Sequence, residues 1–96
     1  MTHYLRVAWH HNLVEEPVDL LSEIDDDGWE IRKVEVYRDG RADWADRSAA
    51  TGRTMLSEAR MPELAEIAAQ VEFTPVVIKA EEFEAAWADA RRSRSW

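Results

Sequence analysis

The 96-residue chain contains no cysteine, only three glycines, and no apolar run that approaches the ~20 residues of a membrane span. The missing cysteine excludes disulfides and thiolate metal sites, and it leaves the cellular compartment open. So few glycines exclude a glycine-rich phosphate loop, and no Gly-x-Ser-x-Gly motif supplies a serine nucleophile. We therefore expect no catalytic residue, no cofactor and no membrane association. Because no signal pattern opens the chain, we also expect a cytoplasmic location.

Metal binding is not expected either. Asp25-Asp26-Asp27-Gly28 resembles the start of a calcium loop, but its glycine comes two positions early and position twelve is Val36 rather than glutamate. Asp-Gly is instead typical of a tight turn. His10 and His11 are adjacent, so on a strand they would point to opposite faces and would not chelate one ion.

Charge is unevenly distributed along the chain. The net charge is −8, but residues 1–90 carry −11 and the last six residues carry +3. An acidic body repels phosphate backbones, which argues against nucleic-acid binding. The acidity favours a protein partner of basic charge, although it would also serve solubility alone.

Alternating apolar residues and two Asp-Gly pairs predict an antiparallel meander. The pattern indicates four strands, over residues 4–10, 18–25, 29–38 and 41–46, with tight turns at Asp27-Gly28 and Asp39-Gly40.

The turn lengths set the expected register of this meander. If both turns are two-residue loops, Glu23 faces Arg32, Ile24 faces Ile31, and Glu35 faces Trp44. The additional Asp26 would alternatively allow a three-residue loop, which shifts the first register by one residue.

Two helices are expected after the meander. Pro62 suits the first position of a helix, and residues 64–71 place their apolar side chains on one face of it. Residues 76–78 predict a short extended segment, and residues 81–92 predict a final helix. Its buried stripe is predicted to comprise Phe83, Ala86, Trp87 and Ala90.

The order of these elements predicts an α+β fold. We expect an antiparallel β-meander of four to five strands with both helices packed on one face. We expect residues 1–92 to form a single α+β domain and residues 93–96 to be a flexible basic tail that ends in Trp.

Three aromatic residues of the meander are the candidate protein-binding residues. In the two-residue-loop register, Trp29, Tyr37 and Trp44 share one face, while the valines between them take the other. Either a bulge near Arg32-Lys33 brings all of these residues to one side, or an aromatic patch is exposed. An exposed patch would suit a partner, because Trp, Tyr and Arg dominate binding hot spots.

The segments 22–25 and 29–40 resemble the sequence pattern of a protein family. Glu23-Ile24-Asp25, then Trp29-Glu30-Ile31-Arg32-Lys33-Val34-Glu35, then Asp39-Gly40 are similar to the pattern of an uncharacterised family of small bacterial proteins, mainly from actinomycetes. The resemblance covers about residues 4–90. It implies no known activity, cofactor or catalytic residue.

Two hypotheses about function remain open. The first is a non-catalytic protein- or peptide-binding domain of the immunity or accessory type, acting as a monomer or weak homodimer. The second is a folded leader or carrier protein, a peptide natural-product precursor whose C-terminal segment is the substrate of a modifying enzyme. The reversed charge and lone aromatic residue of that segment motivate the second hypothesis. Its candidate residues are Arg92, Arg94, Ser95 and Trp96.

Overall fold

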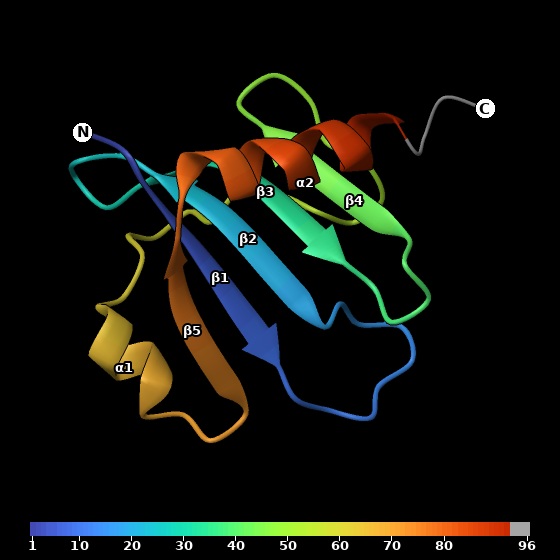
Figure 1. The fold of residues 1–96 in the computed structure, drawn as a ribbon, viewed down its shortest axis with the longest axis horizontal. Helices are drawn as coiled ribbons and strands as arrows, with labels where there is room; N and C mark the ends of the chain where they lie inside the picture. The colour runs from blue at the N-terminus through green and yellow to red at the C-terminus, as the bar shows by residue number, and fades with distance from the viewer. Residues whose placement is uncertain (93–96) are drawn as a thin grey trace.

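The computed structural model describes residues 1–92, which form a five-stranded antiparallel sheet and two helices (Figure 1). Along the sheet the strand order is β4-β3-β2-β1-β5, so β1 to β4 form the meander and β5 is added beside β1. The predicted α+β fold with an antiparallel sheet is confirmed. The strands are β1 His3–Trp9, β2 Asp19–Ile24, β3 Glu30–Val36, β4 Ala42–Asp46 and β5 Phe73–Ile78, and the helices are α1 Leu64–Ala68 and α2 Ala80–Arg92.

The first hairpin joins β2 to β3 through a three-residue loop at positions 26–28. The Asp25 N–H donates to the Trp29 carbonyl over 2.9 Å, and the Gly28 N–H donates to the Asp25 carbonyl over 3.0 Å. Gly28 has a φ of 91°, a conformation that strains residues with a side chain. The Asp25 carboxylate accepts from the backbone of Asp27 and Trp29. This segment is therefore a turn, as predicted, and it follows the three-residue alternative.

A bulge in β3 then restores the predicted register. Ile24 pairs with Glu30, whereas Glu23 pairs with Arg32, so Ile31 is the additional residue on β3. The predicted Glu23–Arg32 pair is confirmed. The predicted Ile24–Ile31 pair is wrong, because the longer loop displaces it by one residue.

The second hairpin also has a three-residue loop, at positions 38–40, where a two-residue loop is predicted. The Tyr37 N–H donates to the Arg41 carbonyl over 2.8 Å, and Gly40 has a φ of 92°. Asp-Gly fits this loop as well as the shorter one, because the glycine supplies the left-handed residue that both need.

The additional loop residue changes which face each β4 side chain occupies. Trp44 pairs with Val34 rather than with Glu35. Since side chains alternate between faces, a shift of one residue moves Trp44 to the face of Val34 and places Ala45 on the opposite face.

Helix α2 covers one face of the sheet. Phe83, Trp87 and Ala90 are buried against Leu21 and Val34 of the central strands. Ala86, the fourth residue of the predicted stripe, is partly buried against the same cluster. The amphipathic pattern of this segment therefore positions the helix as expected.

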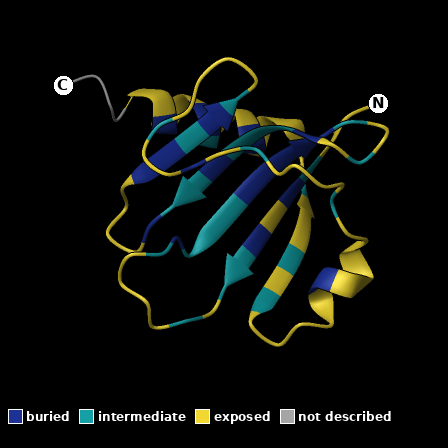
Figure 2. Ribbon diagram, turned by 180° about the vertical axis from the view of Figure 1, so that it is seen from behind, coloured by how far each residue is buried: buried dark blue, intermediate teal, exposed yellow. Residues whose placement is uncertain are grey.

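The opposite face has a smaller core, which consists of Leu5, Val7 and Ile24 packed with Ile67 of α1. The two helices thus lie on opposite faces, and the expectation that both pack on one face is wrong. The physical reason is that β1 and β2 carry apolar residues at both parities, so each face needs a cover. Helix α1 is a single short turn whose one buried residue is Ile67, and Figure 2 shows it as largely exposed. Neither helix in residues 1–92 has the length and apolar character needed to cross a membrane.

Candidate functional site

Two of the three candidate aromatic residues are covered. Trp44 packs edge-on against Trp87 of α2 with ring centroids 5.4 Å apart, and the Arg91 guanidinium lies 4.8 Å from its ring. Tyr37 is 8% exposed, and burial raises the pKa of its phenol above the usual value, with Asp43 adding to the effect.

Trp29 differs from these two residues. It is 38% exposed at the end of the first hairpin, where the Arg60 guanidinium lies 5.6 Å from its ring centroid. Trp29, Tyr37 and Trp44 therefore do not form one exposed surface. The separation follows from the three-residue loop at positions 38–40, which moves Trp44 beneath α2.

The tail residues are only partly described. Arg92 is exposed at the last turn of α2, where it contacts Asp89. Arg94, Ser95 and Trp96 lie outside the residues that the structure describes.

An open cleft of about 430 Å³ lies on the α1 face, between the first hairpin, residues 60–64 and the neighbouring ends of β1 and β5. Leu5 and Ile24 are buried at 4% and 1% exposure and contribute apolar surface to its lining. Leu64 and Val77 also line it, and they are 42% and 61% exposed. The cleft therefore presents apolar surface that residues 1–92 leave uncovered.

The rim of this cleft is acidic. Asp26 and Asp27 of the hairpin and Glu63 before α1 line it, and all three residues are exposed. The N-terminal ammonium of Met1 pairs with the Asp26 carboxylate, so the rim already receives one cation from the chain itself. Arg60 contributes the guanidinium that lies over Trp29. We call this site the acid-rimmed cleft.

The wall formed by residues 60–64 is positioned by the hairpin. The Met61 N–H donates to the Gly28 carbonyl over 2.7 Å, which ties the segment to the turn. Pro62 and Glu63 then lead into α1, which begins at Leu64. Sequence reasoning missed this site because the site joins segments about 35 and 50 residues apart. The available signal was the clustering of acids around Gly28 and before Leu64.

The comparisons with known proteins identify the chain at the family level. A family model described as Domain of unknown function (DUF6881) matches residues 3–92. The chain belongs to this family. No curated protein and no solved structure matches it. The predicted resemblance to an uncharacterised domain family is thereby confirmed, while the proposed motif and the actinomycete origin stay predictions.

A second, smaller hollow of this DUF6881 domain, about 210 Å³, lies on the far side of Met61 and Pro62. Its lining includes Glu30, whose side chain is only 1% exposed and ends in a carboxylate. That carboxylate accepts from the Ser22 hydroxyl over 2.6 Å and the Ser57 N–H over 2.8 Å, and it pairs with Lys33 over 3.2 Å. Because these groups satisfy one another, the cluster holds the segment after β4 against the sheet.

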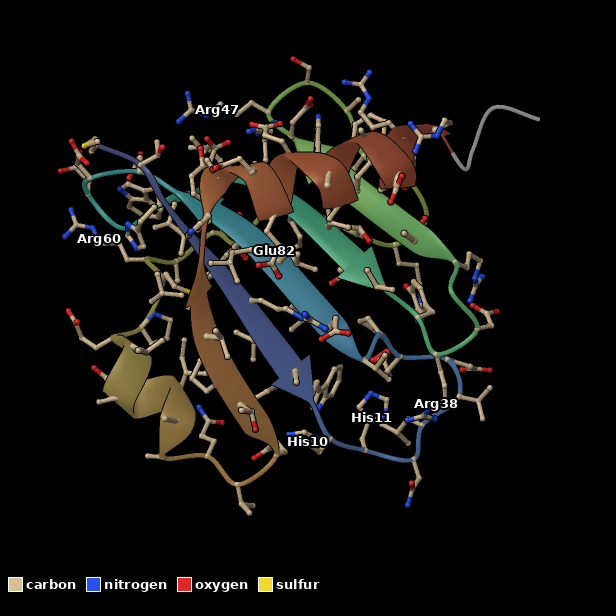
Figure 3. All side chains as sticks on the ribbon, in the orientation of Figure 1. His10, His11, Arg38, Arg47, Arg60 and Glu82 are labelled. Atoms are coloured by element: carbon tan, nitrogen blue, oxygen red, sulfur yellow. The ribbon has the colours of Figure 1, made fainter. Side chains whose placement is uncertain are left out.

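Of the three histidines, His3 lines the acid-rimmed cleft, whereas His10 and His11 lie at the other end of the sheet. Figure 3 shows His10 and His11 far from Arg60. The His10 ring is 2.7 Å from the Thr74 hydroxyl, while the two ring nitrogens of His11 contact the Leu13 N–H and the Pro17 carbonyl. Within residues 1–92, no three His, Asp or Glu side chains gather in an arrangement that would hold a metal ion.

Proposed function

We propose that this DUF6881 domain is a non-catalytic binding domain that holds a basic segment of a partner protein in the acid-rimmed cleft. The observation that carries the proposal is the exposed apolar surface of Leu64 and Val77 beside the carboxylates of Asp26, Asp27 and Glu63. An immunity or accessory role in the cytoplasm fits such a domain, which acts by binding alone.

Charge supports a basic partner. The chain has a net charge of −8, so its field attracts cationic segments and accelerates their association. At the cleft itself, the carboxylates of Asp26, Asp27 and Glu63 are exposed, so a lysine or arginine of a partner could reach them.

Apolar contact supplies the other part of the binding energy. Fully burying a valine or leucine side chain contributes roughly 1.5–3 kcal/mol, so covering the exposed parts of Leu64 and Val77 gives about 1 kcal/mol each. This gain is smaller than the cost of association, so binding of a short segment also needs the charged contacts at the rim and should be weak.

The partner segment inserts side chains rather than extending the sheet. The His10 N–H bonds to the Glu72 carbonyl, and the alternation of antiparallel pairs then makes Val7 and Pro75 a non-hydrogen-bonded pair. Pro75 therefore faces the outer edge of β5, where it removes a donor. The Phe73 N–H is already bonded to the Gln70 carbonyl. The outer edge of β5 therefore offers few backbone N–H groups that could pair with an added strand.

An NMR titration with two synthetic peptides tests the proposal. The first peptide flanks a leucine with arginines, and the second replaces the arginines with glutamates. The first should shift the amide signals of residues around the cleft, including Gly28, Leu64 and Val77. Equal shifts with the acidic peptide, or shifts centred on another surface, would contradict the proposal.

Two variants with the same charge change make the test specific. Asp27 and Asp39 each precede the glycine of a three-residue hairpin loop, but of these two residues only Asp27 lines the cleft. Asp27→Lys should weaken binding of the basic peptide about tenfold, which is the effect of ~1.4 kcal/mol. Asp39→Lys should leave it nearly unchanged. Equal losses of affinity in the two variants would mean that the net charge of the chain, rather than Asp27 in the cleft, determines peptide binding.

The second candidate function is the carrier with a modifiable C-terminal segment. The observation that favours it is the position of Arg91 and Arg92, which are exposed at the end of α2 and bring the chain to the surface there. Mass spectrometry of the natively expressed protein, produced with its neighbouring enzymes, tests this function. A tail of unmodified mass under those conditions would contradict it.

A further inference from the structure

The chain contains a site and a segment that are complementary in charge and in apolar character. The site is the acid-rimmed cleft, with its exposed apolar surface. The segment is Ser93-Arg94-Ser95-Trp96, which follows two more arginines and contains no acid. We propose that this segment of one copy binds in the acid-rimmed cleft of a second copy. The inference rests on the proposed function of the cleft and names one occupant for it.

The complementarity is specific in its chemistry. Trp96 provides a large apolar ring for the surface of Leu64 and Val77. Arg94, two residues away, provides a guanidinium for the carboxylates of Asp26 and Asp27. The cleft volume of about 430 Å³ lies within the range of sites that enclose small ligands, roughly 300–1,000 Å³.

The cleft of the same copy is out of reach. Helix α2 begins two residues after β5, at the end of the sheet that carries the cleft, and its 13 residues extend about 20 Å away from it. Figure 1 shows the last turn of α2 and the N-terminus on opposite sides of the molecule. The four residues after Arg92 span at most about 14 Å when fully extended. The cleft also lies on the sheet face opposite α2, so the occupant must come from another molecule.

The arrangement predicts how association depends on concentration. A contact between a tail and a cleft is heterologous, and each copy keeps one free tail and one free cleft after pairing. The average mass should therefore continue to rise with concentration rather than stop at a dimer. At ~0.15 M salt the Debye length is about 8 Å, so repulsion between the acidic bodies is screened more than the close contacts in the cleft.

Sedimentation of the full chain from about 10 μM to 1 mM tests the proposal. Trp96→Ala and Arg94→Glu should remain monomeric where the unmodified chain associates. Arg47→Glu makes the same charge change at an exposed position outside the cleft, and it should associate like the unmodified chain. Association that survives Trp96→Ala would overturn the proposal, as would a chain that stays monomeric at 1 mM.

Mixing two variants gives the decisive measurement. Trp96→Ala keeps an intact cleft, and Asp27→Lys keeps an intact tail, so each alone should be monomeric at the lowest concentration at which the unmodified chain associates. Their mixture should form a one-to-one dimer that grows no further, because only one productive contact remains. Since each variant must fold to complement the other, this result also excludes misfolding as the cause of the monomers. A mixture that stays monomeric would overturn the proposal.

The outcome also separates this inference from the proposed function. If the arginine-flanked peptide binds in the cleft while the full chain stays monomeric, the tail is not an occupant and the cleft remains a site for a foreign partner. If neither the peptide nor the tail binds, both proposals are wrong.

Discussion

The contact between α2 and the sheet depends on Arg32, whose loss we expect to destabilise the fold strongly. Its guanidinium contacts Glu23 on β2 and makes a bidentate contact with Glu84 on α2. It also lies 4.9 Å from the ring centroid of Phe83 and 5.0 Å from that of Trp87. The side chain thus joins two strands and the helix through one planar group.

The two carboxylates of this network contribute unequally. The Glu23 side chain is 11% exposed, whereas that of Glu84 is 52% exposed. Breaking a buried ion pair by removing one partner costs about 3–5 kcal/mol, and an exposed pair contributes about 0–1 kcal/mol. Because Arg32 itself is 21% exposed, we reduce the first figure to about 2–3 kcal/mol.

Arg32→Met is the informative substitution, because methionine preserves much of the apolar stem that packs on the rings. Within residues 1–92, the substitution leaves the Glu23 carboxylate with only the hydroxyl of Tyr4, 3.1 Å away, as a side-chain hydrogen-bond partner. We expect the free energy of unfolding to fall by about 2–3 kcal/mol. Glu84→Ala should cost less than about 1 kcal/mol.

Urea unfolding followed by tryptophan fluorescence measures both values. With an m value of about 1 kcal/mol/M, Arg32→Met should lower the midpoint by roughly 2–3 M. Adding Glu23→Gln to Arg32→Met should recover part of the loss, since it removes the unpaired buried charge. An Arg32→Met variant no less stable than Glu84→Ala would refute the reasoning.

Two further predictions concern pH and backbone conformation. The hydrogen bond from Arg32 holds the pKa of the Glu84 carboxyl below its ordinary value of 4.5, so its stabilising effect is present above that value and is lost as the pH falls through the lower folded-state pKa. Melting temperatures from pH 7 to pH 3 should therefore decline less in Glu84→Gln than in the unmodified chain, and identical profiles would contradict this assignment. Gly40→Ala meets no atom within 4 Å and should cost only the ~1 kcal/mol of a positive φ, whereas the Cβ of Gly52→Ala would lie 2.6 Å from the Asp43 carboxylate and should cost more. Calorimetry measures the loss of stability in each variant. Equal losses would show that the Asp43 carboxylate moves away from the added Cβ at no cost.

Local signals in the sequence predict the elements but not the faces. Strands β1 to β4, both turns and the stripe of α2 follow from period and from Asp-Gly chemistry, which act within a few residues, whereas only residues 76–78 of β5 are predicted as extended. Loop length at Asp39-Gly40 does not follow, because the pair suits two-residue and three-residue loops equally. That single residue decides whether Trp44 faces α2 or the opposite side.

The cleft depends on contacts that no local pattern encodes. It requires the hairpin at residues 26–28, the segment at 60–64 and Val77 to meet at one end of the sheet. The meeting depends on β5 pairing with β1 and on the bond from Met61 to Gly28. Sequence reasoning therefore identified the aromatic residues, whose chemistry is visible locally, rather than the acids and aliphatic residues that line the cleft.

The unequal cover of the two faces explains where the cleft lies. Helix α2 buries Phe83, Trp87 and Ala90 against the sheet. Arg32 of the sheet also joins the helix to it through ion pairs with Glu23 and Glu84. Helix α1 has five residues and buries only Ile67, so the opposite core remains small and its edge stays open at Leu64 and Val77. An exposed apolar surface is tolerated when charged groups surround it or when a partner covers it. The acidic rim supplies such charged groups, and under the proposed function its negative charge would favour a basic partner.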